Sequence, residues 1–360
     1  MIYIHKFHPQ YLHPFQYKYM KILEENAIDY KLVDSQSPTF WEEIIDCSLF
    51  IMFLGQTPMH LQRQLSLINV LDNIVGIRCF PNWNTSWHFD DKISQYYLLK
   101  SQGFPIVSSH IFWDKDLAIE WAKSANYPQV FKLKGGAGSL NVIKVYNSKQ
   151  AMKLISKMFG KGITDGNIPG VKLFKVYRNN IKTFMKNKIK YRLYTLGLRY
   201  GITENWSKHQ GYAFFQDFLP NNDYDTRVTI IGKRGFAFQR KNRPADFRSS
   251  GSGIINFSPN NIDYRCLKIA FSISQKFNFQ CMSYDFLYDL NKQMTINELS
   301  CQFVDSAIYS CPGYWDKNLN WHEGHFWPQY CQLQDLLDKP NLIQPAFPEK
   351  SKPALIRITP

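Results

Sequence analysis

Apolar residues in the first 80 positions form short runs that alternate with stretches of helical spacing. Strands are predicted at residues 2–4, 48–54 and 74–80, and helices with one apolar face at residues 15–23 and 61–68. The 48–54 run is almost continuously apolar, as expected of a strand buried on both faces. Strands that alternate with helices in this way predict a small α/β unit with a parallel sheet.

Two further helices and a lysine-bearing strand come next. The apolar spacing of residues 93–100 predicts a helix that ends near Gly103. Asp114 is predicted to cap the following helix. The buried stripe of that helix is predicted to be Leu117, Ala118, Trp121 and Ala122. Residues 128–134 then read as a strand that carries lysines and leads directly into a glycine-rich loop.

The pattern from residue 212 onward is dominated by strands. Alternation predicts strands at residues 212–220, 225–232 and 235–243, followed by a helix at 264–277. The stretch 284–303 contains two short apolar runs joined by a polar turn at Asp289 to Gln293, which predicts a β-hairpin.

That hairpin carries two acids, Asp285 in its first strand and Glu298 in its second. Pairing of the strands would bring both carboxylates to the same end of a sheet. Carboxylates so placed repel unless a cation lies between them, and their oxygens suit Mg²⁺ that carries a nucleotide phosphate. The alternative is that Asp285 caps a strand and Glu298 lies on a solvated face.

Composition predicts a folded, basic protein. The chain has 360 residues, with 44% apolar and 16% aromatic residues, which excludes a disordered chain and predicts two or three domains. The formal net charge of +14 predicts attraction to polyanions. The charge is compatible with several anionic partners: nucleic acid, an anionic membrane surface, nucleotides and acidic sugars.

Targeting signals and cysteine usage favour a cytoplasmic location. The N-terminal stretch has no apolar signal region, and no run of eighteen apolar residues occurs. The seven cysteines are odd in number and contain no C-x-x-C spacing, so we expect reduced thiols, mostly in the core, with neither a disulfide framework nor a zinc site. Contact with the inner face of the membrane is a further expectation.

The glycine-rich loop and the basic stretch after it each allow two interpretations. Gly135, Gly136 and Gly138 allow consecutive backbone N–H groups to face an anion, although no Walker A sequence is present and a plain hairpin turn is the alternative. Residues 151–210 contain thirteen Lys/Arg and two Asp/Glu. This stretch is either a solvated face or a docking surface for an acidic substrate or membrane.

In this order, the motifs resemble the ATP-grasp superfamily, and RimK-like carboxylate–amine ligases in particular. VFKLKGGAGSLNV is similar to the lysine strand and small-residue loop over the phosphates, and FFQDFL to the linker whose backbone reads adenine. The arginine and Mg²⁺ elements of the family resemble three further stretches: DTRV, FQRKNRPADFRSSGSG, and YDF with NELS. The tail, ELSCQF followed by CPGYWDKNLNWHEGHF, resembles a bacterial polysaccharide-biosynthesis branch of the teichuronopeptide or capsule type.

The resemblance implies an α/β (α+β) ATP-grasp fold with a small parallel α/β domain at the N-terminus. Residues 1–85 would form that first domain, and 86–210 a central subdomain with the lysine strand, glycine loop and basic insertion. Residues 211–335 would form the C-terminal subdomain with the Mg²⁺-binding acids, and 336–360 a tail.

The resemblance also implies a set of site residues. Contacts with ATP are expected from Lys92, Lys132, Lys134, Gly136, Ser139, Gln216, Asp217, Phe218, Leu219 and Asp225. Ligation of Mg²⁺ is expected from Asp285, Glu298 and Ser300. Stabilisation of the transferring phosphoryl group, or binding of the substrate carboxylate, is expected from Arg227, Arg240 and Arg248, because a planar guanidinium binds such anions bidentately. For each residue the alternative is a surface or structural role, such as Asp246 pairing with a neighbouring arginine.

The metal motif departs from the family pattern of Glu, any residue, Asn. Here the register gives Glu298, Leu299 and Ser300, with Asn297 on the wrong side of the glutamate. A serine hydroxyl is a weaker metal ligand than an amide oxygen. The gap from Asp285 to Glu298 is also one residue longer than in RimK-like proteins, and we expect the hairpin turn to absorb it.

The implied function is that of an ATP-dependent carboxylate–amine ligase that forms an amide through an acyl phosphate. The resemblance of the tail implies that an amino acid or amine is joined to an acidic, uronate-containing glycan in surface polysaccharide biosynthesis. The alternative is a non-catalytic protein that binds nucleic acid or a membrane surface on the same scaffold. We do not expect nucleic acid as a partner, because a polyanion binder gains nothing from paired acids at its groove.

Overall fold

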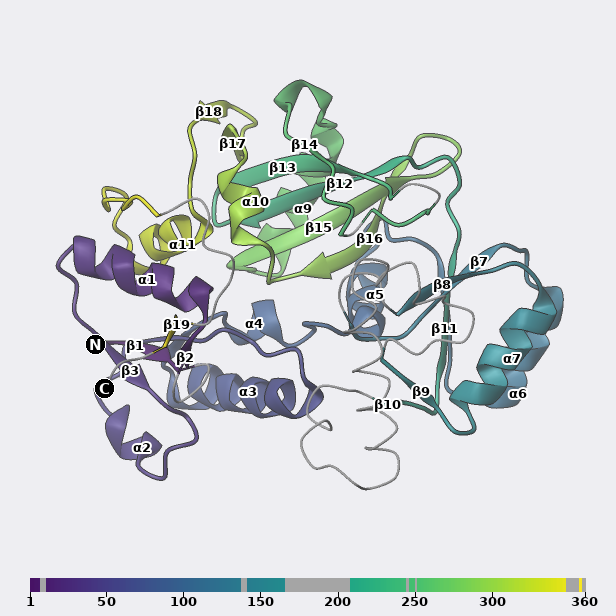
Figure 1. The fold of residues 1–360 in the computed structure, drawn as a ribbon, viewed down its shortest axis with the longest axis horizontal. Helices are drawn as coiled ribbons and strands as arrows, with labels where there is room; N and C mark the ends of the chain where they lie inside the picture. The colour runs from purple at the N-terminus through teal and green to yellow at the C-terminus, as the bar shows by residue number, and fades with distance from the viewer. Residues whose placement is uncertain are drawn as a thin grey trace. The chain divides into compact units, whose positions relative to one another are not determined.

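The computed structural model describes residues 1–6, 11–136, 141–165, 208–243, 246–249, 251–347 and 356–357 (Figure 1). The chain divides into two compact units. The first unit comprises Met1–Gly55, Arg63–Phe89 and Asn221–Pro360, and the second comprises Gln56–Gln62 and Asp90–Pro220. The four segments bounded at residues 85, 210 and 335 remain a prediction.

A four-stranded sheet in the order β3-β1-β4-β5 begins the first unit. All of its strand pairs are parallel, which confirms the predicted parallel sheet. Its strands are β1 (Ile2–His5), β3 (Tyr30–Val33), β4 (Leu49–Ile51) and β5 (Arg78–Phe80). The helices along this part of the sequence are α1 (Pro14–Glu25), α2 (Phe40–Glu43), α3 (Pro58–Val70), the π-helical turn η1 (Leu71–Val75) and α4 (Trp83–Ser86).

The strand predicted at residues 74–80 is shorter than expected. The helical path continues through η1, and Gly76 ends it in the left-handed region at φ 81°. Glycine adopts this conformation without a steric penalty, so Gly76 can end the helix. Strand β5 begins after it, at Arg78.

A larger sheet of seven strands completes the first unit, in the order β16-β15-β12-β13-β17-β18 with β14 paired to β13. Its strands are β12 (Tyr224–Ile231), β13 (Arg234–Lys241), β14 (Ile255–Asn256), β15 (Cys281–Tyr288), β16 (Met294–Ser300), β17 (Gly313–Asp316) and β18 (Trp321–Glu323). Helix α9 (Tyr264–Lys276) covers one face (Figure 1), where Ser274 Oγ lies 2.7 Å from Tyr284 Oη.

The opposite face of this sheet joins a core shared with the parallel sheet. Ile231, Phe236 and Cys281 are buried in one apolar cluster with Ile4 of β1 and Tyr19 of α1. Two later helices, α10 (Asp305–Tyr309) and α11 (Pro328–Leu337), contribute to the same cluster, and α11 lies beside α1 (Figure 1). The short strands β2 (Tyr11–Leu12) and β19 (Ile356–Arg357) pair with each other.

The second unit contains a four-stranded sheet in the order β6-β11-β7-β8. These strands are β6 (Ser109–Phe112), β7 (Gln129–Lys132), β8 (Val142–Val145) and β11 (Ala213–Asp217), and β9 (Ile163–Thr164) pairs separately with β10 (Lys208–His209). The helices are α5 (Lys92–Ser101), α6 (Lys115–Ser124) and α7 (Ser148–Met158). Asp114 caps α6 as predicted, but Leu117 is 61% exposed, so the buried stripe is narrower than the sequence indicated.

All seven cysteines are free and buried, in agreement with the predicted core thiols. Across the described ranges, no helix combines the length and the apolar character needed to cross a bilayer.

Candidate functional site

A charged patch lies on the seven-stranded sheet, on the face opposite α9. Asp225 and Arg227 are two residues apart on β12, so they point to the same side. Asp225 is directly opposite Arg240 on β13, and Arg227 is directly opposite Asp285 on β15. Strand pairing therefore brings four of the predicted site residues together.

These four residues form a buried network of ion pairs. Arg227 donates from Nε and Nη2 to the two carboxylate oxygens of Asp285, at 2.6 and 2.8 Å. Arg240 donates to both oxygens of Asp225, at 2.7 and 2.6 Å, and its Nη2 also lies 2.6 Å from Asp285 Oδ2. The side chains of Asp225, Arg240 and Asp285 are at most 9% exposed. Each guanidinium thus binds a carboxylate of the chain itself bidentately.

The two carboxyl groups differ in electrostatic character. Burial raises the pKa of Asp225 to about 6, with a further contribution from the charge of Asp285 and partial compensation by Arg240. Burial would also raise the pKa of Asp285, but Arg227 and Arg240 together hold it well below its usual range. Asp285 therefore keeps its charge, and Asp225 is the first of the pair to accept a proton.

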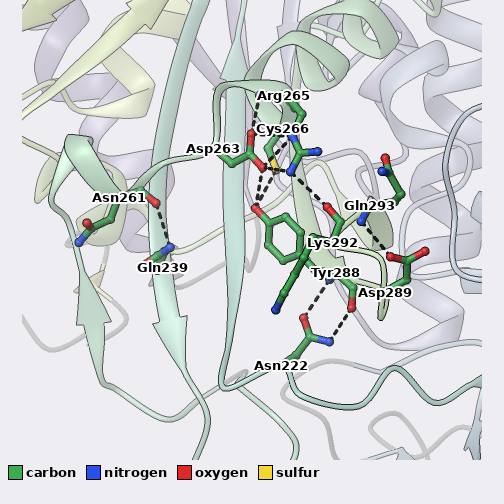
Figure 2. A network of polar contacts seen from close by, with 10 residues as sticks. All are labelled: Asn222, Gln239, Asn261, Asp263, Arg265, Cys266, Tyr288, Asp289, Lys292 and Gln293. Carbon is green, nitrogen blue, oxygen red and sulfur yellow. Dashed lines mark hydrogen bonds and ion pairs between the residues drawn. The ribbon is translucent and has the colours of Figure 1, made fainter.

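The hairpin of β15 and β16 places Glu298 directly opposite Asp285, which confirms the predicted proximity of the two acids. The predicted turn at Asp289 to Gln293 is also present. Figure 2 shows how this turn is anchored: the hydroxyl of Tyr288 lies 3.2 Å from Asp263 Oδ2, and Arg265 donates to the Lys292 carbonyl at 3.2 Å. These contacts fix the strands that carry the acids.

The paired strands of the hairpin contain a β-bulge, which was not predicted from the sequence. The pairing shifts between Asp285, opposite Glu298, and Phe286, opposite Ile296. Ile296 and Leu299 are both buried on the α9 face. The two residues between them, Asn297 and Glu298, therefore share the opposite face. Asn297 precedes Glu298 in the sequence and so departs from the family pattern, but the bulge places it on the same face of the sheet as Asp285.

Ser300 and Arg248 are less suited to their predicted roles. The Ser300 hydroxyl donates to the Gln302 carbonyl at 2.6 Å and accepts the Gln302 N–H at 3.3 Å, so it closes a local turn. Arg248 donates to Asp246 from Nε and from Nη2, the latter at 2.7 Å. This is the pairing named as the alternative for Asp246.

Lysines gather on one face of the four-stranded sheet in the second unit. Phe131 and Phe215 belong to the face covered by α6 and α7. By alternation and register, Lys132, Lys144 and Gln216 lie on the opposite face. The Nζ of Lys144 is 3.4 Å from the centroid of the Phe218 ring, a cation–π contact that was not predicted from the sequence.

The remaining predicted linker residues do not all reach this face. The carboxylate of Asp217 lies on the helix-covered side, 3.1 Å from His110 Nε2 and 3.0 Å from Gln129 Nε2. The Asp217 N–H donates to the Ser108 carbonyl at 2.9 Å. Leu219 follows β11 and is half-buried, and Ser139 lies outside the described residues.

The described part of the glycine-rich loop is held by polar contacts on several sides. Lys92 Nζ donates to the Gly136 carbonyl at 2.9 Å, and Asp90 Oδ1 accepts the Gly136 N–H at 2.7 Å. Lys134 Nζ lies 3.4 Å from Asp91 Oδ2. A Cβ on Gly136, which has φ 97°, would lie 2.1 Å from Asn141 Nδ2. Both the backbone conformation and the space therefore require glycine at position 136.

A buried hydrogen-bond chain supports the loop and was not found from the sequence. His209 Nε2 lies 2.9 Å from Asp165 Oδ1, and His209 Nδ1 lies 2.8 Å from Tyr212 Oη. Tyr212 Oη in turn accepts the Lys134 N–H at 2.9 Å, and burial raises the pKa of this phenol. Asn141 Nδ2 joins Asp165 to the Gly135 carbonyl, at 2.8 and 3.0 Å.

Comparison with known proteins gives matches by structure alone. No family model and no curated relative matches the sequence. The chain is similar to the ATP-grasp ligase PsnB complexed with minimal precursor, with 13% identity over 94% of this chain and 99% of that chain and a TM-score of 0.54. The chain has the ATP-grasp fold.

Two carboxylase structures show the same fold. One is the biotin carboxylase domain of the 2-oxoglutarate carboxylase from Hydrogenobacter thermophilus, complexed with MgADP, ADP and bicarbonate. It matches with a TM-score of 0.54 and 12% identity, over 92% of this chain and 68% of that chain. The other is the biotin carboxylase–β,γ-ATP complex from Campylobacter jejuni, with a TM-score of 0.51 and 12% identity, over 84% of this chain and 65% of that chain. The chain thus spans about two thirds of each carboxylase.

Proposed function

We propose that this protein is an ATP-dependent ligase that joins a carboxylate to an amine. The observation that carries the proposal is the charged patch, where an ATP-grasp chain presents Asp285, Asn297 and Glu298 beside Arg227 and Arg240 on one face of a sheet. Neighbours of the same fold are complexes with ADP, MgADP or β,γ-ATP, which supports ATP and Mg²⁺ as ligands here.

The second unit supplies groups suited to a nucleotide. Lys132 and Lys92 would neutralise phosphate charge, with Lys134 and Gly136 beside them. Gln216 shares the face of Lys132, and Phe218 offers a ring that already contacts a cation. In this proposal the backbone after β11, as far as Leu219, would read the adenine edge.

The oxygen donors of the charged patch fit Mg²⁺. Glu298 and Asp285 provide carboxylates, and Asn297 provides an amide oxygen on the same side because of the bulge. We therefore assign the third protein ligand to Asn297 and not to Ser300, whose hydroxyl closes the turn to Gln302. Bound there, Mg²⁺ would neutralise phosphate charge.

The arginines would act on the reacting groups. In the proposed reaction a carboxylate oxygen of the substrate attacks the γ-phosphorus of ATP, ADP leaves, and the resulting acyl phosphate is attacked by the amine. The amine then loses a proton and phosphate leaves. Arg227 and Arg240 are held in fixed orientations by Asp285 and Asp225, so they are preorganised to stabilise the negative charge of the transferring phosphoryl group.

Thermal unfolding with nucleotide and metal tests this proposal. ATP with Mg²⁺ should stabilise the protein by about 2.7 kcal/mol at one hundred times Kd. Glu298→Gln should abolish the Mg²⁺-dependent part of the shift, Asn297→Ala should reduce it, and Ser300→Ala should leave it unchanged. Absence of any shift in the parent protein would remove the basis for the proposal. A screen of ADP release over amino acids and uronate glycans would then identify the substrates.

We further propose an acidic glycan at the inner membrane face as the carboxylate substrate. The support is charge: thirteen of the basic residues fall between residues 151 and 210, against two acidic ones. Exposed charges act over about 10 Å at 0.1 M salt. The apparent KM for a uronate polymer should therefore rise with ionic strength while that for ATP changes less. Equal salt responses would exclude this substrate class.

A further inference from the structure

The glycine-rich loop of the second unit contains a carboxylate of the chain itself. Asp90 Oδ1 accepts the Gly136 N–H at 2.7 Å. The same side chain lies so close to the loop that a Cβ on Gly135 would be 3.2 Å from Asp90 Oδ2. Asp90 has φ 55°, in the left-handed region that few residues other than glycine adopt. A negatively charged oxygen thus lies at a backbone N–H of a loop suited to anions.

Three other backbone groups of this loop have neutral or cationic partners within the chain. The Lys134 N–H donates to Tyr212 Oη at 2.9 Å, and the Gly135 carbonyl accepts from Asn141 at 3.0 Å. The Gly136 carbonyl accepts from Lys92 at 2.9 Å. The Gly136 N–H differs from these three groups, because its partner is a carboxylate, that of Asp90.

We propose that Asp90 is an internal competitor for phosphate, which occupies the oxyanion position at the Gly136 N–H and must be displaced when a phosphorylated ligand binds this loop. The inference rests on the proposed function and adds a residue that sets the affinity for nucleotide. A carboxylate and a phosphate cannot share one N–H donor, and two negative charges a few ångströms apart repel strongly where water is partly excluded. Asp90 lowers nucleotide affinity on both grounds.

Two substitutions separate charge from hydrogen bonding. Asp90→Asn keeps an oxygen acceptor for the Gly136 N–H and tolerates the left-handed backbone, but it removes the charge. Asp90→Gly removes the acceptor altogether and relieves the backbone conformation. Asp114→Asn is the matched control, because Asp114 accepts backbone N–H groups at the start of α6 within the same unit.

Calorimetric titration with ADP and with tripolyphosphate gives the first measurement. We expect Asp90→Asn to bind both ligands at least about tenfold more tightly than the parent. This difference in affinity should narrow as salt is added. Asp114→Asn should bind like the parent. Equal affinities for parent and Asp90→Asn would overturn the inference while leaving the ligase proposal intact. Weaker binding by Asp90→Asn would overturn it too, since Asp90 would then assist the ligand.

Amide hydrogen exchange provides a measurement that needs no nucleotide. In the ligand-free protein, Asp90→Gly should accelerate exchange of the Gly136 amide, while the Lys134 amide, held by Tyr212, stays protected. Unchanged exchange at Gly136 would show that the carboxylate does not hold this N–H. If neither parent nor variant binds ADP or tripolyphosphate, the inference and the proposed function fall together.

Discussion

Replacing Arg240 by methionine should strongly destabilise the first unit. Arg240 is 7% exposed and binds Asp225 through two hydrogen bonds, and it also contacts Asp285 at 2.6 Å. Methionine fills a similar volume but carries no charge. The substitution therefore leaves the Asp225 carboxylate buried without its bidentate partner, whereas Asp285 keeps Arg227.

The size of the effect follows from the uncompensated charge. Breaking a buried pair by removing one partner costs about 3 to 5 kcal/mol, much more than the pair itself contributes relative to apolar residues. The double variant Asp225→Asn with Arg240→Met removes both charges, so it should lose less stability than Arg240→Met alone. A positive coupling of roughly 1 to 3 kcal/mol is expected for groups in one network.

Urea denaturation of the single and double variants measures these differences. The matched control is Lys21→Met, because Lys21 pairs with Glu24 on the surface of the same unit and its side chain is 42% exposed. Water and salt screen such a pair, so the control should show no resolvable change. If Arg240→Met lost less than about 1 kcal/mol, or if the double variant were less stable than the single one, the account of a buried, mutually dependent network would be wrong.

Two further predictions concern a buried histidine and a glycine. Burial lowers the pKa of His5 to about 4, whereas in the unfolded state this imidazole accepts a proton near pH 6.5. The free energy of unfolding should therefore be largest above pH 6.5 and should fall by up to about 3 kcal/mol as the pH decreases toward 4. His5→Gln should flatten the pH dependence of the unfolding free energy between pH 4 and 6.5. An unchanged slope would show that the pH dependence arises from other groups. Gly136→Ala should destabilise the second unit by more than Gly103→Ala, because both have positive φ but only Gly136 has a neighbour where Cβ would lie. Equal losses of thermal stability in the two variants would mean that the contact between the new Cβ and Asn141 is relieved at little cost in free energy.

Local pattern predicted the hairpin of the charged patch well. Alternation and the polar turn from Asp289 to Gln293 are short-range signals, and they gave the correct strands and the pairing of Asp285 with Glu298. The bulge was not predictable, because Asn297 carries no signature of a bulge. An extra residue between two strands fits a longer turn equally well until the register is known.

The supporting contacts could not be read from the sequence because they join distant positions. Asp165 and His209 are 44 residues apart, and neither has a spacing typical of a ligand or a catalytic pair. Lys144 is one lysine among many until β8 pairs with β7 and brings it near Phe218. The order of several motifs predicted the fold, whereas the partners of each side chain required the tertiary structure.

A last prediction follows from how fully Asp285 is neutralised in the absence of ligand. Two guanidinium groups contact this carboxylate, so a divalent cation arriving alone would meet two positive charges beside its ligands. On the proposed function, phosphate oxygens entering with the metal would offset that repulsion. Mn²⁺, used as a paramagnetic substitute for Mg²⁺, should therefore bind at least roughly tenfold more tightly when ADP is present than alone. Arg227→Gln should narrow this difference by relieving the repulsion of free Mn²⁺, while Lys21→Gln on the surface should not. Electron paramagnetic resonance titration measures free Mn²⁺ directly, and equal affinity with and without ADP would show that the arginines do not oppose the metal.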